Sequence, residues 1–106
     1  MPDKLCSGVP SPEDKDALSS LRTQIDGIDE ALQELFESRM LLIKDIAAYK
    51  KAHGRTVLDS IREAEKLAAV EARAAAGLEP YDAAFFHAVM ELSRRRQEEL
   101  LGEQEK

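Results

Sequence analysis

The apolar residues of the first half of the chain recur at alternating steps of three and four positions. The series is Leu18, Leu21, Ile25, Ile28, Leu32 and Leu35. This spacing predicts one face of a long amphipathic helix. The next position of the series is Arg39, and the apolar residues then resume at Leu42 and Ile46. A side chain that is always charged therefore interrupts an apolar face.

Cap and turn residues divide the chain into three predicted helices. The first begins at Ser11-Pro12, where a hydroxyl cap precedes proline, and runs to Lys51, before Gly54. The other two are predicted from about residue 57 to 76 and from about residue 81 to 101, on either side of Gly77. No segment alternates with the two-residue period of a strand, so the predicted fold is all-α, with one long and two shorter helices.

The length of the first helix predicts a dimer. About 40 helical residues extend roughly 60 Å, whereas a compact domain of this size has a radius of gyration of about 13 Å. Two helices of about 20 residues cannot cover the whole apolar face. We therefore expect a second copy of the chain to cover the rest in an intertwined, two-fold symmetric homodimer, with no stable folded monomer.

Composition narrows the class of protein. The 106 residues are enough for one domain, which we assign to residues 11–102, with a disordered leader at 1–10 and a tail at 103–106. A net charge of −6 argues against nucleic-acid binding, and we interpret the run Arg94-Arg95-Arg96 as cations that complement the end of the third helix. Without an apolar run of about 20 residues or a secretory signal, we expect no membrane span and a cytoplasmic location.

Several polar residues occupy positions that the helical pattern assigns to a packed face. Arg39 and Lys50 are 11 positions apart, which places them within about 20° of each other on one helix face, where both could converge on a small anion. The alternative for Arg39 is a buried ion pair with an acid on a neighbouring helix. Ser93 and Gln97 lie one turn apart within the apolar stripe of the third helix. Because buried polar groups need partners, they predict a polar pocket in the bundle.

The second predicted helix carries a group of charged residues that could belong to the same polar pocket. Asp59, Arg62 and Glu63 fall within an arc of about 100°, although a solvent-facing helix surface would look the same. His53 and His87 have no metal-ligand spacing, and there is no matched nucleophile and base or cofactor motif. We therefore expect no metal and no cofactor, and a chemistry that depends on fixed charge and shape.

The chain resembles the all-α chorismate mutases of the AroQ class, in their short monofunctional form, from Leu18 to Leu101. Its segment LRTQIDGIDEALQELFESR is similar to the family's L-R-x-x-I-x-x-I-D-x-x-L-x-x-L-x-x-x-R, and VLDSIREAE is similar to V-x-D-x-x-R-E. Eight positions match the family's active-site residues in type and order: Arg22, Arg39, Lys50, Asp59, Arg62, Glu63, Ser93 and Gln97. The resemblance implies the chorismate mutase II fold, an intertwined homodimer of three-helix chains.

The resemblance also implies a reaction, the [3,3] rearrangement of chorismate to prephenate in phenylalanine and tyrosine biosynthesis. In this family the enzyme holds the dianionic substrate in its reactive conformer and stabilises developing charge, without a cofactor. Arg39 and the partner's Arg22 would bind the two carboxylates, with Arg62 at the edge of the pocket and Ser93 on the carboxylate side. Because Arg22 is 17 residues from Arg39, roughly 25 Å along the helix, it could reach the site only from the second chain.

The remaining matches imply roles at the other end of the substrate. Lys50 and Gln97 would donate hydrogen bonds to the ether oxygen, while Glu63 and the backbone near Asp59 would hold the ring hydroxyl. Some relatives carry a glutamate in place of Gln97, which must be protonated to donate, so the amide predicts activity that persists at pH 7 to 8.

Two alternatives to the mutase stay open. The first is an isochorismate pyruvate-lyase, an enzyme whose helical scaffold looks the same as that of the mutases. Such lyases, however, lack the acid that matches Glu63. A non-catalytic helical module for dimerisation or protein binding would use Arg39, Ser93 and Gln97 only as structural residues. The family resemblance also leaves open that another shikimate-pathway enzyme is a partner, which would dock onto this protein.

Overall fold

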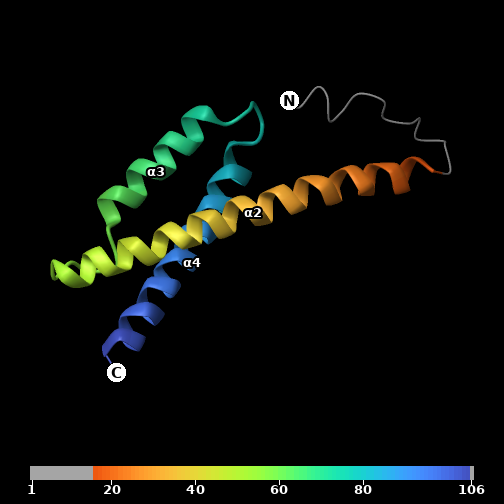
Figure 1. Cartoon of the computed structure of the whole chain (residues 1–106). Coiled ribbons are helices and arrows are strands. Elements are labelled where there is room, and N and C mark those ends of the chain that lie inside the picture. The colour runs from red at the N-terminus through yellow and green to blue at the C-terminus, as the bar shows by residue number, and fades with distance from the viewer. Residues whose placement is uncertain (1–15, 106) are drawn as a thin grey trace. The chain divides into compact units, whose positions relative to one another are not determined.

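The computed structural model describes the backbone of residues 16–105 and the side chains of residues 16–102, and within this range every regular element is a helix. The helices are α2 (Ala17–Ala52), α3 (Ser60–Arg73) and α4 (Glu79–Glu105), which are labelled in Figure 1. The predicted all-α class, with one long and two shorter helices, is confirmed. The predicted leader at 1–10 and the predicted helix start at Ser11-Pro12 lie outside the described residues.

The chain divides into two compact units, Met1–Ser38 and Arg39–Lys106. In the first unit the described residues form the N-terminal part of α2. The apolar series predicted there is largely exposed in the single chain, at 41 to 70% for Leu18, Ile25, Ile28, Leu32 and Leu35. An exposed apolar face of this kind is suited to a protein partner, and the homodimer stays a prediction.

The core of the second unit draws on all three helices. Its buried apolar residues are Ile43 and Ala47 of α2, Val70 of α3, and Val89, Met90 and Leu100 of α4. Helix α3 packs against α4. None of the described helices is long and apolar enough to cross a membrane.

The inward face of α2 in the second unit differs from the predicted one. The sequence pattern resumes at Leu42 and Ile46, but these side chains are 63 and 42% exposed, whereas Ile43 and Ala47 are buried. Residues 39, 43 and 47 are four positions apart and so share one face of the helix. Arg39 belongs to both rows. Beyond it, the buried positions 43 and 47 each lie one residue, or about 100° around the helix, from the predicted positions 42 and 46.

Backbone geometry explains where α2 ends. The Arg55 N–H donates to the Lys50 carbonyl at 2.8 Å, and the Gly54 N–H donates to the Lys51 carbonyl at 3.3 Å. Gly54 has a φ of 65°, in the left-handed region that glycine adopts without strain. This pair of bonds is a Schellman cap, as the glycine predicted.

The other two helices differ from their predicted bounds by a few residues. Helix α3 begins only at Ser60, because Asp59 is its N-cap and accepts a hydrogen bond from the Arg62 N–H at 2.9 Å. It ends at Arg73 instead of residue 76. Helix α4 includes Pro80 in its first turn, where proline needs no backbone donor, and continues to Glu105.

Candidate active site

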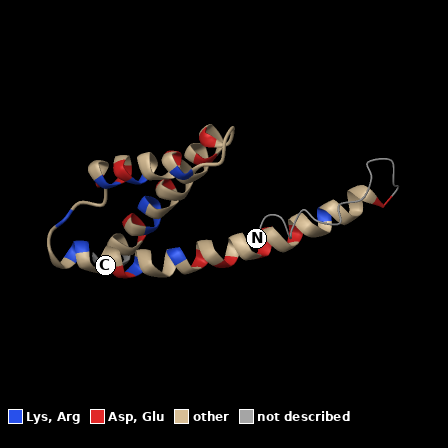
Figure 2. Ribbon diagram, turned by 90° about the horizontal axis from the view of Figure 1, so that it is seen from above, with Lys and Arg blue, Asp and Glu red and all other residues tan. Residues whose placement is uncertain are grey.

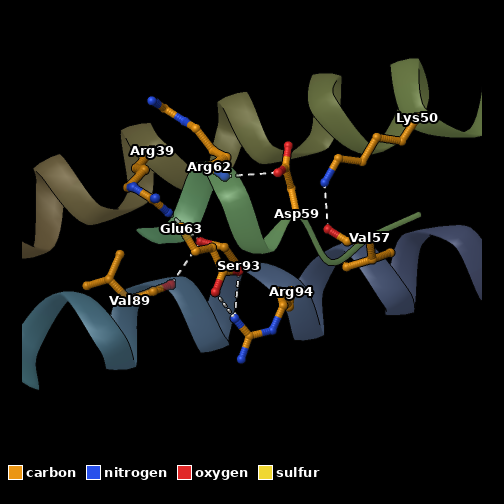
Figure 3. A network of polar contacts seen from close by, with 9 residues as sticks. All are labelled: Arg39, Lys50, Val57, Asp59, Arg62, Glu63, Val89, Ser93 and Arg94. Atoms are coloured by element: carbon orange, nitrogen blue, oxygen red, sulfur yellow. Dashed lines mark hydrogen bonds and ion pairs between the residues drawn. The ribbon is translucent and has the colours of Figure 1, made fainter. Parts of the chain in front are cut away.

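A cavity of about 390 Å³ lies within the second unit, and α2, α3, α4 and the loop after α2 all contribute to its lining. Seven of the eight site residues predicted from the sequence line it: Arg39, Lys50, Asp59, Arg62, Glu63, Ser93 and Gln97. The fold thus brings together residues that are up to 58 positions apart in the chain, from 39 to 97. Figure 3 shows the polar contacts that connect most of them.

Arg39 is held by a hydroxyl group. Its Nη1–H donates a hydrogen bond to the Oγ of Ser93, and the Ser93 hydroxyl donates to the Val89 carbonyl at 2.9 Å (Figure 3). Ser93 is only 4% exposed, so this chain of bonds fixes one edge of the guanidinium from inside the bundle. No carboxylate among residues 16–102 pairs with Arg39. The predicted alternative, a buried ion pair for Arg39, is therefore not what this part of the chain forms.

The electrostatic environment of Arg39 disfavours its own charge. Burial, and then the neighbouring positive charge of Arg62, lower the pKa of Arg39 below its ordinary value. The first effect is a loss of hydration and the second is repulsion between like charges, and no carboxylate among the described residues offsets them. An anion in the cavity would offset them.

Glu63 forms an ion pair with Arg94 at the cavity. The Arg94 Nη1 lies 2.6 Å from each of the two carboxylate oxygens of Glu63, and the side chains are 32 and 24% exposed (Figure 3). This contact links α4 to α3 at the cavity. The interpretation of Arg94 as a cation near a helix end is wrong, because α4 continues to Glu105 and Arg94 lines the site.

Lys50 and Asp59 also make defined contacts. The Lys50 Nζ donates to the Val57 carbonyl at 2.6 Å, which ties the end of α2 to the loop before α3. The Asp59 carboxylate accepts from the Arg62 N–H at the start of α3. Asp59 thus has a structural function as the cap that sets where Arg62 and Glu63 begin their helical turn.

Gln97 is a buried amide with an unsatisfied end. The residue is 5% exposed, and its Oε1 has no hydrogen-bond partner among the described residues. Buried polar groups are nearly always hydrogen-bonded, so an orphaned one next to a cavity indicates a site for a ligand. Because an amide carries a donor and an acceptor that exchange places by rotation about one bond, Gln97 can present either.

The cavity is basic although the chain is acidic. Its lining includes three cations that the sequence pattern did not single out for this site, Arg55, Lys66 and Arg94. With Arg39, Lys50 and Arg62 they make six basic side chains against two acidic ones, Asp59 and Glu63, in a chain of net charge −6. Along the N-terminal part of α2, in contrast, acidic residues predominate (Figure 2). The local excess of positive charge favours a small anionic ligand.

The histidines have local contacts. His53 stacks on Tyr49 with ring centroids 4.0 Å apart, and its Nδ1 lies 2.9 Å from the Tyr49 carbonyl oxygen. Within the described part of the chain, no group of three or more His, Cys, Asp or Glu residues is placed to hold a metal ion.

The sequence model of the family described as chorismate mutase type II matches residues 21–98, well over half of the chain. The chain belongs to the chorismate mutase type II family. The comparison with curated proteins and the comparison with solved structures give no match. Membership confirms the family resemblance and agrees with the all-α fold, and it supports a chorismate mutase type of activity.

One of the eight site residues predicted from the sequence does not line the cavity. Arg22 belongs to the first unit, is exposed, and does not line the cavity in the second unit. The sequence carries only weak signals for the additional residues that line the cavity. Arg94 lies three positions before Gln97 and so shares a helix face with it, but only the tertiary contact with Glu63 distinguishes it from its arginine neighbours.

Proposed function

We propose that this chain is a chorismate mutase that converts chorismate to prephenate by an intramolecular [3,3] rearrangement. The observation that carries the proposal is Arg39, a half-buried guanidinium without a carboxylate partner among the described residues, in a cavity with six basic and two acidic side chains. The substrate is a dianion, so the excess charge and the substrate are complementary. Family membership supports the same assignment.

The proposed mechanism begins with conformational restriction. Arg39 binds one carboxylate with the guanidinium N–H groups that its bond to Ser93 leaves free. Because Ser93 is itself held by the Val89 carbonyl, the guanidinium cannot follow the motion of a flexible substrate. Arg62, whose side chain is exposed at the edge of the cavity, assists from outside. Holding the two reacting ends of the substrate together removes much of the entropic part of the barrier.

The second part of the mechanism is stabilisation of charge. As the ether bond breaks, negative charge develops on its oxygen, and the Lys50 ammonium and the Gln97 amide donate hydrogen bonds to it. Lys50 already donates to the Val57 carbonyl, which uses one of its three protons and leaves two for the substrate. Glu63 accepts a hydrogen bond from the ring hydroxyl. No proton needs to leave or enter the substrate, so fixed charges suffice.

The proposed active enzyme is a homodimer with shared active sites. The exposed apolar side chains of the N-terminal part of α2 provide a surface for a second copy. The partner's Arg22 would then complete the cation set for the second carboxylate. A cytoplasmic location and docking onto another shikimate-pathway enzyme stay predictions.

The test is the loss of the chorismate diene absorbance at pH 7.5 on addition of purified protein, with prephenate identified among the products. The wild type should form prephenate, and Arg39→Ala should lower kcat/KM by at least about a hundredfold, because a charged ligand to the substrate is lost. Arg95→Ala, at an exposed position of α4, is the matched control and should keep full activity. Circular dichroism checks that each variant is folded.

Three other outcomes would contradict the proposal. Turnover of isochorismate to salicylate and pyruvate, without prephenate from chorismate, would indicate the lyase. No turnover of either substrate by the folded wild type would indicate a helical binding module. Equal activity of the wild type and Arg39→Ala would remove Arg39 from the mechanism.

A further inference from the structure

We infer that Arg94 is a positioning residue for Glu63: it fixes the carboxylate that accepts the hydroxyl of the substrate ring. The inference rests on the proposed function and assigns a residue outside the eight that resemble the family series. Among the arginines of the run 94–96, Arg94 forms an ion pair with a different helix, whereas Arg96 pairs with Glu99 on α4 itself and Arg95 is exposed.

The geometry of the pair restricts both side chains. One nitrogen, Nη1 of Arg94, lies 2.6 Å from both carboxylate oxygens of Glu63. A donor at the same short distance from both oxygens ties both ends of the carboxylate to α4 and so restricts its movement. Both side chains are two-thirds or more buried, so solvent screens this pair less than an exposed one.

The pair leaves Glu63 able to bind the substrate. A carboxylate has about four lone-pair positions, and the contacts with Arg94 use two of them. The others can accept a hydrogen bond from a hydroxyl group of a molecule in the cavity, which both residues line. Arg94 therefore orients the acceptor without competing for the hydroxyl.

This role differs from that of a direct substrate ligand. Arg94 is already engaged through Nη1, and its charge is matched by the charge of Glu63. Arg39, in contrast, has only the Ser93 hydroxyl as a partner among described side chains, so its charge is available to an anion. The two arginines thus have different roles. Arg39 binds the substrate, and Arg94 holds Glu63, which binds it.

A double-mutant cycle tests the inference. The wild type, Arg94→Met, Glu63→Gln and the double variant are assayed for kcat and KM with chorismate, and for thermal stability. Arg95→Met, the same substitution at the adjacent exposed position, is the control and should leave kcat/KM unchanged. We expect Arg94→Met to lower kcat/KM about tenfold, and to have no further effect in the Glu63→Gln background, because the two residues act as one unit.

A lysine at position 94 sharpens the test. Arg94→Lys keeps a cation that can contact Glu63 through a single nitrogen, so it should recover part of the activity that Arg94→Met loses. A structural role would lower the melting temperature without this dependence on Glu63. If Arg94→Met fails to fold, Arg94→Lys takes its place in the same cycle.

The outcomes separate the inference from the proposed function. An equal loss from Arg94→Met in both backgrounds would mean that Arg94 acts independently of Glu63: on the fold if the melting temperature falls, and on the substrate itself if it does not. No loss at all would mean that Arg94 has no part in the reaction. Either result, with an active wild type, overturns the inference alone. A folded wild type without prephenate formation overturns the proposed function, and the assigned role of Arg94 with it.

Discussion

Replacement of Gln97 by methionine should make the protein more stable and remove most of its activity. The two side chains are similar in length and in helix propensity, so the substitution changes mainly the polarity of the buried group. In the wild type the amide is 5% exposed and its Oε1 has no partner among the described residues. Methionine has no polar atom of comparable strength to leave unsatisfied.

The size of the stability gain follows from the missing hydrogen bond. A buried polar group without a partner costs about 1 to 3 kcal/mol. Because part of this cost is offset by any contact of the amide nitrogen, we expect a gain of about 1 kcal/mol in the free energy of unfolding, or a rise of a few degrees in melting temperature. The loss of a donor to the developing oxyanion should lower kcat by about 100- to 1,000-fold.

Thermal denaturation and the chorismate assay should be run at the same protein concentration, since the stability of the proposed dimer would depend on concentration. Gln33→Met, at an exposed position of α2, is the matched control for the effect of the substitution on the helix. A fall in melting temperature for Gln97→Met that exceeds the change in the control would refute the reasoning. It would show that the amide contributes a hydrogen bond to folding, and that the orphaned oxygen is not a cost.

Three further predictions concern the same unit. Asp59→Ala should lower the free energy of unfolding by about 1 kcal/mol because α3 loses its N-cap, whereas Asp59→Asn should keep most of it; urea denaturation measures both. Gly54→Ala should cost about 1 kcal/mol in the same assay, because φ is 65° there although no atom lies within 4 Å of the added Cβ, and an unchanged midpoint would contradict this. Gln97→Glu should restrict activity to acidic pH: only the protonated acid donates, so kcat/KM should fall tenfold per pH unit above the carboxyl pKa, while the wild-type profile stays level from pH 7 to 8.

Helical periodicity alone singled out four residues that line the cavity, Arg39, Lys50, Ser93 and Gln97. Ser93 and Gln97 interrupt an apolar stripe, and both are buried at the cavity. Arg39 interrupts another stripe and lies at the same cavity. These predictions succeed because a polar residue on a packed face needs a partner wherever the helices meet.

Contacts between helices could not be predicted in the same way. Arg94 and Arg95 are both arginines of α4. Only the packing of α3 against α4 brings Arg94, and not Arg95, to Glu63. The inward face of α2 was misplaced for a related reason. The long apolar series includes every position of the helix that could pack against another helix. Ile43 and Ala47 are the positions of its C-terminal part that are buried within one chain. The contacts of the proposed second copy would add apolar positions to the sequence pattern and so conceal the pattern of the single unit.

The unfavourable features of this unit are concentrated at its cavity. The lowered pKa of Arg39 means that its charged form is less stable in the folded chain than in the unfolded one. This cost is present at every pH below the lowered pKa, and therefore at neutral pH, where arginine stays charged. The orphaned oxygen of Gln97 adds a second cost at the same place. A ligand with carboxylates and hydrogen-bonding oxygens would offset the cost at Arg39 and engage the Gln97 amide, so the site is built for the bound state at the expense of the free one.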